Sequence, residues 1–398
     1  MSSRLKKLRV IFFSGKGGVG KTTTAAATAL CTASLGYKTI IISTDPAHSL
    51  SDTFQINLAR SVQPITKNLD GIEIDAFHEL DTNWGHIKDY LSSLIVTLGA
   101  EDAIAGELAI IPGMDNLFSL LRIKEFYDSG KYDVLIIDMA PTGESLRLLS
   151  LPQIVSMALK ITRYLEKYIV SPVIRPASKM SKSLRAVVAP ESVTHSWEQV
   201  LEKLLDMRNL FEQESVTSTR LVLNPEKMVI SESQRAWTYL NLFGMITDHI
   251  IINRVIPKEG LQGYFKDRQT SQRNNLKTIY DNFSPLPITE VPYFKDEVIG
   301  ISRLNELGKL IYKDQDPAQL FYSEKPIRVH SVKKEKIFAI KMPFVENNNV
   351  DVISRGNELI VTIGNQIRSF VLPDSLSLLK AKSAEYNNGW LEIIFTKK

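Results

Sequence analysis

A phosphate-binding loop near the start of the chain constrains the fold more than any other feature of the sequence. Residues 15–23 read Gly-Lys-Gly-Gly-Val-Gly-Lys-Thr-Thr and match the pattern G-x-x-x-x-G-K-[ST]. The apolar run from Val10 to Phe13 precedes the loop, and an alanine- and threonine-rich stretch from Lys21 to Gly36 follows it. This order of strand, loop and helix is the one that a phosphate cradle requires. A glycine-rich turn without a ligand is the alternative.

Each residue type in the loop has a chemical reason to be there. Glycines leave room for successive backbone N–H groups to converge on an anion, and the following helix N-terminus adds partial positive charge. Lys21 is placed to meet the β- and γ-phosphate oxygens of a nucleotide, and the Thr22 hydroxyl to coordinate the Mg²⁺ between them. The predicted nucleotide-binding residues of the loop are Gly15, Lys16, Gly17, Gly18, Val19, Gly20, Lys21, Thr22 and Thr23.

A second lysine, Lys16, directly follows the first glycine of the loop. A side chain that projects from the first turn of the loop cannot easily fold back onto the phosphates of its own nucleotide. Supplied across a dimer, it would neutralise charge in the transition state as an arginine finger does. We therefore predict a catalytic role for Lys16 in a homodimer. A solvated surface lysine is the alternative.

Two further carboxylates are predicted to lie at the carboxyl ends of strands. The β-rich run Tyr37–Thr44 ends at Asp45, and the apolar run Val134–Ile137 ends at Asp138. Open α/β sheets bind their ligands at this edge. Asp45 is predicted to be catalytic, because a carboxylate near the γ-phosphate can orient a water for attack. The alternative for Asp45 is a helix N-cap before Pro46. Asp138 has the Walker B form and is predicted, with Thr22, to hold the metal.

Three ordered segments give the sequence a family resemblance. With the loop, the segments Asp45–Asp52 and Asp138–Arg147 resemble switch I and switch II of the ArsA-type deviant-Walker-A ATPases, in particular those that deliver tail-anchored membrane proteins in the guided-entry pathway. The resemblance implies ATP as the nucleotide and a switch role for Pro46, His48, Asp138, Pro141, Thr142, Gly143 and Glu144. Family members usually carry His where Glu144 stands here.

The same resemblance supplies two contacts on the adenosine side. The segment Leu221–Glu226 resembles a strand and loop whose glutamate reaches the nucleotide across the dimer, which would be Glu226. The segment Ile250–Asn253 resembles a strand whose terminal asparagine hydrogen-bonds adenine, which would be Asn253. An amide offers both a donor and an acceptor to the adenine edge. The alternative for such an asparagine is an ordinary turn residue.

Composition narrows the possible partners. The formal net charge is +4 with scattered basic residues, which gives no nucleic-acid footprint. The single cysteine, Cys31, excludes a disulfide framework within one subunit. With one cysteine the chain lacks the C-x-x-C zinc pair of the guided-entry ATPases and the several cysteines of arsenite-pump relatives. We therefore expect no bound zinc and no arsenite transport. No apolar run approaches the roughly 18 residues of a membrane-spanning helix, and we expect a cytoplasmic protein without an integral membrane segment.

Residues 1–322 alternate apolar strands with helical stretches, which predicts an α/β fold with a doubly wound, mostly parallel sheet. A helical subdomain, about 84–126 and 152–215, interrupts the alternation. Within it the apolar residues Ile154, Met157, Ile161 and Leu165 recur at helical spacing. One explanation of such a stripe is packing against the protein core. The family resemblance implies instead a groove that holds a hydrophobic client helix of a membrane-protein precursor.

The end of the chain has a different texture. A charged, Pro-containing linker is predicted over 323–336, and an all-β sandwich over 337–398. The predicted strands are Ile337–Met342, Val350–Arg355, Glu358–Ile363, Gln366–Leu372, Leu379–Tyr386 and Trp390–Thr396. The run Arg368–Pro373 and the segment Lys380–Ile393 resemble an α-crystallin, small-heat-shock-protein-like domain.

These features together predict a homodimeric, Mg²⁺-dependent ATP hydrolase whose nucleotide cycle opens and closes a hydrophobic groove for a membrane-protein or chaperone-type client. One alternative is a partitioning or positioning switch that acts on a scaffold or membrane surface. Such a switch would require a basic DNA patch or an amphipathic terminus. The other alternative is a regulatory chaperone module whose hydrolysis is incidental.

Overall fold

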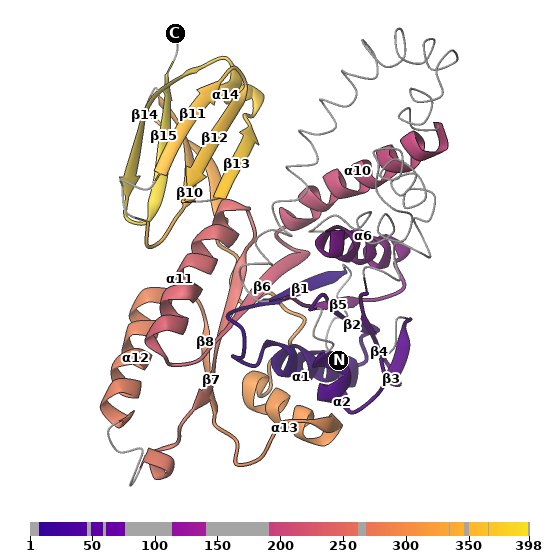
Figure 1. The fold of residues 1–398 in the computed structure, drawn as a ribbon. Helices are drawn as coiled ribbons and strands as arrows, with labels where there is room; N and C mark the ends of the chain where they lie inside the picture. The colour runs from indigo at the N-terminus through magenta and orange to yellow at the C-terminus, as the bar shows by residue number, and fades with distance from the viewer. Residues whose placement is uncertain are drawn as a thin grey trace, which may run out of the picture. The chain divides into compact units, whose positions relative to one another are not determined.

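The computed structural model describes residues 8–45, 49–58, 61–75, 114–140, 191–261, 268–333, 335–345, 350–364 and 366–396. The chain divides into two compact units. The larger comprises Met1–Glu73, Gly130–Leu146 and Leu210–Lys398, and the smaller comprises Ile74–Ser129 and Arg147–Asn209. Figure 1 labels the elements of both units.

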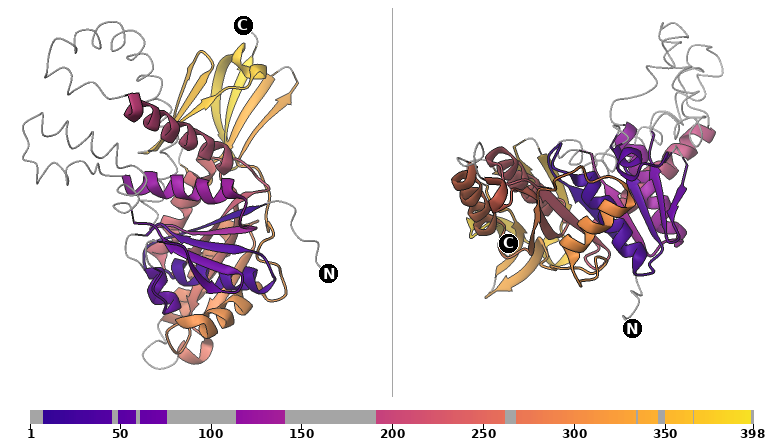
Figure 2. Two further views of the ribbon diagram at one scale, coloured as in Figure 1. Left: turned by 90° about the vertical axis from the view of Figure 1, so that its right-hand side faces the viewer. Right: turned by 90° about the horizontal axis from the view of Figure 1, so that it is seen from below.

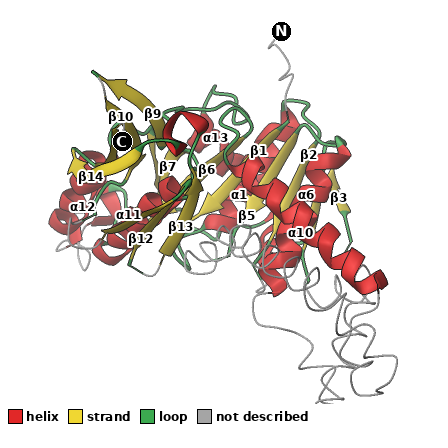
Figure 3. Ribbon diagram, turned by 90° about the horizontal axis from the view of Figure 1, so that it is seen from above, coloured by secondary structure: helices red, strands yellow, loops and turns green. Residues whose placement is uncertain are grey.

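An eight-stranded sheet forms the centre of the larger unit, in the order β3-β4-β2-β5-β1-β6-β7-β8 (Figures 1 and 3). All neighbouring strands are parallel except the pair β3 and β4. The predicted mostly parallel α/β sheet is confirmed. The strands are β1 (Arg9–Ser14), β2 (Thr39–Ser43), β3 (Gln63–Thr66), β4 (Leu69–Glu73), β5 (Val134–Asp138), β6 (Thr217–Leu223), β7 (Thr247–Val255) and β8 (Ile288–Pro292).

The middle of this sheet is buried on both faces, because every residue of β1, β2, β5 and β6 is buried. Near-continuous apolar runs are typical of parallel strands covered by helices on both sides. The register sets Phe13 of β1 and Ser43 of β2 beside Asp138 of β5. The carboxyl ends of these three strands therefore meet at one edge.

Helices connect these strands. The described helices around this sheet are α1 (Lys21–Ser34), α2 (Ser49–Phe54), α11 (Lys227–Leu242), the 3-10 helix η2 (Lys258–Leu261), α12 (Arg268–Phe283) and α13 (Gly300–Tyr312). Helix α1 lies along the sheet (Figure 2) and packs tightly against α13, where a Cβ on Gly308 would lie 2.3 Å from the Cys31 sulfur. Right-handed crossovers run in opposite directions from the centre of the sheet, which places α11 and α12 on the face opposite to α1.

Two buried arginines fix the segment that follows α13. Arg9 donates to the Ala318 carbonyl (3.0 Å), and Arg220 donates to the Pro317 carbonyl (2.6 Å) and to the Tyr312 hydroxyl (2.9 Å). Burial lowers the pKa of Arg9 to about 10, and that of Arg220 is raised by its phenol and carboxylate neighbours against the effect of burial. Because unpaired buried charges are costly, these bonds hold the segment firmly against the sheet.

The smaller unit contributes α6 (Met114–Ser129) and most of α10 (Glu191–Phe211). Lys203 of α10 forms an ion pair with Glu125 of α6 (3.8 Å), so the two helices lie side by side. Helix α10 falls within the predicted range 152–215, and α6 begins within the predicted range 84–126 and extends beyond it. The predicted client-groove residues Ile154, Met157, Ile161 and Leu165 lie outside the described residues, as do residues 84–113 of the predicted helical subdomain.

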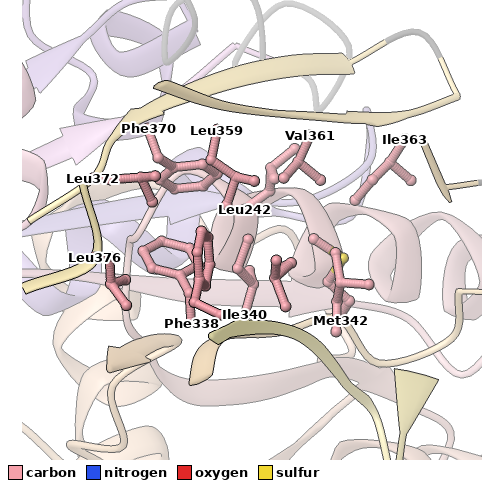
Figure 4. Close-up of a cluster of buried hydrophobic side chains, with 13 residues drawn as sticks. Leu242, Phe338, Ile340, Met342, Leu359, Val361, Ile363, Phe370, Leu372 and Leu376 are labelled. Carbon is pink, nitrogen blue, oxygen red and sulfur yellow. The ribbon is translucent and has the colours of Figure 1, made fainter. Parts of the chain in front are cut away.

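The C-terminal part is a sandwich of two antiparallel sheets, ordered β14-β15-β10-β9 and β11-β12-β13. Its core side chains face one another between the sheets (Figure 4). This confirms the predicted all-β sandwich. The elements are β9 (Ile327–Val332), β10 (Glu335–Lys341), β11 (Val350–Arg355), β12 (Glu358–Ile363), β13 (Gln366–Val371), α14 (Asp374–Ser377), β14 (Lys380–Asn387) and β15 (Trp390–Thr396).

Strand β9 corrects one expectation, since it lies within residues 323–336, which the sequence assigned to a linker. It pairs antiparallel with β10. The sandwich also shares its core with the nucleotide-binding part, because Leu242 at the end of α11 is one of the buried core residues. Arg368 of β13 donates to the Leu242 carbonyl (2.8 Å) and to Glu212 (2.6 Å). The two parts are therefore packed together rather than loosely tethered.

Candidate nucleotide-hydrolysis site

The phosphate-binding loop connects β1 to α1 at the carboxyl edge of the sheet. At two of its positions only glycine fits. At Gly15, with φ +150°, a Cβ would lie 2.2 Å from the Val222 carbonyl oxygen. At Gly20, with φ +94°, it would lie 2.3 Å from Nδ2 of Asn253. The neighbouring strands β6 and β7 thus approach the loop so closely that only glycine fits. The loop conformation is therefore fixed before any ligand arrives.

Lys21 begins α1 and is 6% exposed, so its ammonium lies inside the loop rather than in solvent. Its Nζ donates to the Lys16 carbonyl oxygen (3.3 Å). Burial lowers the pKa of Lys21, and the nearby carboxylates, first Asp138 and then Asp45, act in the opposite direction. A buried cation inside a glycine-rich loop at a helix N-terminus is the arrangement that binds β- and γ-phosphates.

Asp138 is the most unusual side chain of the site. It is fully buried at the end of β5, and neither carboxylate oxygen has a hydrogen-bond partner among the described residues. Burial raises the pKa of Asp138 to about 7, although the Thr22 hydroxyl and the Lys21 ammonium both lower it. A buried carboxylate without partners is costly for the folded protein unless a ligand compensates it. This chemistry fits a hard divalent cation held by carboxylate and hydroxyl oxygens.

The Thr22 hydroxyl is held in place by a helix that begins within the segment predicted as switch I. Thr22 Oγ1 lies 3.1 Å from the Ser49 hydroxyl, at the start of α2. The carboxylate of Glu73, at the end of β4, accepts hydrogen bonds from the backbone N–H groups of Leu50 and Ser51 (both 2.9 Å). Glu73 thereby caps α2. The sequence analysis missed Glu73, although a glutamate at a buried strand end is the same signal that identified Asp45.

Asp45 is placed where the sequence predicted, two residues after the end of β2. It is partly buried, and its backbone N–H donates to the Ser43 hydroxyl (3.3 Å). Its charge acts on the pKa of both Lys21 and Asp138, which places it beside the phosphate-binding residues. The structure therefore brings together the loop, Asp45 and Asp138 at one edge.

Lys16 points toward α11 of its own chain. Its Nζ lies 3.6 Å from the carboxylate of Glu232, with both side chains about one-third exposed. The sequence analysis assigned no role to Glu232, because a contact between residues so far apart in the chain leaves no local signal. Because one chain is present, a role for Lys16 across a dimer stays a prediction.

A cavity of about 460 Å³ opens beside the loop on the side of β7 and β8. Asn253 lies at its base, where Nδ2 donates to the Val19 carbonyl (2.8 Å) and Oδ1 accepts from the Arg254 N–H (2.9 Å). The amide thus fixes the loop, and each of its atoms has one further position for a base. The lining residues are Gly20, Thr23, Asn253, Arg254, Pro292, Tyr293, Phe294, Lys295, Asp296, Glu297, Val298, Ile299 and Leu307.

Other predicted residues are not brought into this cavity. Glu226 is the N-cap residue of α11 and lines a different cavity from the one that Asn253 lines. The switch residues Pro46, His48, Pro141, Thr142, Gly143 and Glu144 lie outside the described residues. No helix in the described part of the chain is long and apolar enough to cross a membrane.

The site has the features of a P-loop nucleotide hydrolase: a glycine-rich loop on a parallel sheet, a buried lysine, and an aspartate at a strand end without a hydrogen-bond partner among the described residues. Comparison with known families agrees. Residues 8–313 match the anion-transporting ATPase family, ArsA, and residues 333–395 match the HSP20-like domain found in ArsA. The chain belongs to the ArsA family of ATPases. The resemblance drawn from the sequence, including the small-heat-shock-protein-like domain, is confirmed.

Curated relatives carry two kinds of name. The chain is 40% identical over 390 residues to a "Putative arsenical pump-driving ATPase" of Prosthecochloris vibrioformis, which covers 98% of this chain and 96% of that protein. It is 36% identical over 388 residues to a similarly named protein of Aquifex aeolicus, covering 95% and 97%. It is also 29% identical over 323 residues to "ATPase get3" of Neurospora crassa, covering 79% and 93%.

Proposed function

We propose that the chain is a homodimeric, Mg²⁺-dependent ATP hydrolase whose nucleotide cycle controls a hydrophobic groove for an apolar helix of a membrane-protein precursor. The observation that carries the hydrolase part is the meeting of the loop, Lys21, Asp45 and the partnerless Asp138 at one edge of the sheet. The groove and its client are inferred from sequence pattern and family.

The residues divide the chemistry between them. Backbone N–H groups of the loop and the Lys21 ammonium hold the β- and γ-phosphates, and Asp45 orients the attacking water and accepts its proton. Thr22 and Asp138 would hold Mg²⁺, either directly or through water. The ion neutralises charge on the phosphate oxygens when it is bound. Glu73 and α2 keep the Thr22 hydroxyl in position.

A dimer would recruit Lys16. In the single chain its ammonium is paired with Glu232, so it must leave that carboxylate before it reaches a partner's phosphates. Such an exchange costs little, because a partly exposed ion pair contributes only about 0–1 kcal/mol. Glu226, exposed at the start of α11, is proposed to reach the partner's nucleotide from the same side.

The hydrolase is tested with three variants. Lys21→Ala should abolish ATP binding or turnover, because the phosphate charge loses its cation. Asp45→Asn should keep ATP bound and slow its hydrolysis, since the amide cannot accept the proton of water. Lys38→Ala, at an exposed lysine just before β2, is the matched control and should leave both ATP binding and hydrolysis unchanged. Turnover by Lys21→Ala near the wild-type rate would refute the site.

The client proposal is supported by the sequence relatives named get3, by the apolar stripe of the helical segment and by the HSP20-like domain. Met157→Glu and Ile161→Glu test it. Each should reduce capture of a synthetic transmembrane helix while the melting temperature and ATP turnover stay unchanged. Gln153→Glu, on the polar face of the same stretch, is the control. Loss of folding at both apolar positions would make the stripe ordinary core.

The names of other relatives raise a second function, the driving of an arsenical pump. The one cysteine argues against it here. Trivalent arsenic is bound by thiolates, whereas burial raises the pKa of Cys31 to about 11 and its sulfur lies against Gly308 of α13. ATP turnover measured with and without arsenite decides between the two. Stimulation by arsenite that survives Cys31→Ser would require a site that this reasoning does not provide.

A further inference from the structure

A second cavity, of about 590 Å³, lies at the carboxyl ends of β6 and β7. It contains no residue of the phosphate-binding loop. We propose that it is a binding site for inorganic phosphate or a small phosphorylated molecule. The lining residues are Asn224, Pro225, Glu226, Lys227, Arg254, Ile256, Arg268, Ser271, Gln272, Asn275 and Tyr293.

The charge of the lining favours an anion. Three cations, Lys227, Arg254 and Arg268, face one carboxylate, Glu226. Within the described residues the side chains of Lys227 and Arg254 form no hydrogen bond or ion pair, so both are available to a ligand. Arginine and lysine around a compact space are the usual phosphate-binding groups. Cavities of this volume are also typical of small-molecule sites.

Two helices begin at this cavity. Helix α11 starts at Lys227 and α12 at Arg268, and neither has an acidic residue in its first turn. The N-cap residue of α11, Glu226, makes no side-chain capping bond. A cation at a helix N-terminus is unfavourable, because the macrodipole is positive there. An anion between the two helices would be stabilised by both dipoles and would compensate both cations.

A buried polar group points independently to a ligand. Asn224 is 8% exposed, and its Oδ1 has no hydrogen-bond partner among the described residues. A buried amide oxygen without a partner costs about 1–3 kcal/mol, and a phosphate hydroxyl or a sugar hydroxyl could donate to it. The surrounding walls are already fixed, because Gln272 bonds both backbone groups of Ile256 (2.9 Å each) and Asn275 donates to the Pro225 carbonyl (2.9 Å).

Arg254 connects this site to the nucleotide cavity. Arg254 and Tyr293 line both cavities. The backbone of Arg254 has a φ of +57°, a conformation in which arginine is strained and glycine is not. The guanidinium is thus presented between the cavities at a conformational cost. A phosphate bound there would contact a side chain that also lines the cavity beside the phosphate-binding loop, so its binding should change ATP affinity.

The test measures binding of inorganic phosphate and ribose 5-phosphate by calorimetry to the full chain. All proteins in this experiment carry Lys21→Ala, which removes the phosphate-binding lysine of the loop, so the result does not depend on hydrolysis. Binding at millimolar concentration or tighter is expected, and Arg254→Gly should weaken it at least about tenfold, the size of a lost charge-assisted hydrogen bond. Because glycine accepts the positive φ, Arg254→Gly should not unfold the protein.

Two further variants complete the experiment. Lys227→Ala should also weaken binding of these phosphates, whereas Arg273→Ala should not. Arg273 is an exposed arginine of the same helix α12 that does not line the cavity. Equal affinity of the Arg254→Gly and Arg273→Ala proteins, or no binding of either phosphate at millimolar concentration, would overturn the proposal.

Discussion

Replacement of Asp138 by asparagine should stabilise the nucleotide-free protein while it destroys the response to Mg²⁺ and ATP. Asp138 is fully buried, its oxygens have no hydrogen-bond partner among the described residues, and burial raises its pKa to about 7. A side chain that only served the fold would not be placed at such a cost. Asparagine has nearly the same shape and resembles the neutral carboxyl group.

The size of this stability change follows from the linkage between folding and protonation of Asp138. The carboxyl ionises near pH 3.8 in the unfolded chain and near 7 in the folded one. Between these values the folded chain binds the extra proton, so its stability falls as the pH rises from about 4 to about 7. A difference of about three pH units corresponds to about 4 kcal/mol. At pH 8 the variant should therefore melt higher than the wild type by roughly 5 °C, and at pH 4 by nearly nothing.

Thermal unfolding monitored between pH 4 and 8 in the presence of EDTA measures this difference. Asp281→Asn, an exposed position on α12, is the control and should follow the wild type at every pH. Mg²⁺ and ATP should then raise the melting temperature of the wild type and not of Asp138→Asn. An Asp138→Asn protein that melts below the wild type at pH 8 would refute the reasoning, because the carboxylate would then be stabilised within the fold.

Three other outcomes follow from named contacts. Glu232→Gln should release Lys16 and raise ATP turnover up to about fivefold, the worth of a partly exposed ion pair, and slower turnover would show that the pair supports catalysis. Gly20→Ala should weaken ATP binding at least about tenfold in calorimetry, because its Cβ would displace Asn253, and unchanged affinity would contradict the close packing. Arg368→Ala should lower the free energy of unfolding by about 3 kcal/mol in urea titration, and a loss below about 1 kcal/mol would mean that the sandwich is held by other contacts.

Local sequence patterns were sufficient to predict much of the fold and several residues of the candidate site. The order of strand, glycine loop and helix located Lys21, and apolar runs that end in a carboxylate located Asp45 and Asp138. Each of these signals resides in one continuous segment of the chain, and the topology of a parallel sheet then brings the strand ends together. The alternating strands of the sandwich were equally local, because turn residues separate them.

The rest required contacts that no local pattern carries. Strand β9 was mistaken for a linker because it is an edge strand with no buried residue, so polar side chains such as Arg328 and His330 interrupt its apolar positions. Glu73 and Glu232 act through segments distant in sequence, one by capping α2 and the other by holding Lys16. Asn253 was predicted as a base contact, and its bond to the loop adds a role that only the packing of β7 reveals.

ATP turnover in mixtures of two inactive variants tests the paired hydrolase most directly. Lys16→Ala and Lys21→Ala subunits are mixed at varying ratios, and heterodimers are verified with distinguishable tags. If Lys16 acts across the dimer, one site of each heterodimer collects both lesions and the other is intact, so turnover should recover to a maximum at equal mixing. Verified heterodimers without turnover at any ratio would contradict the account, because each site would then carry a lesion of its own.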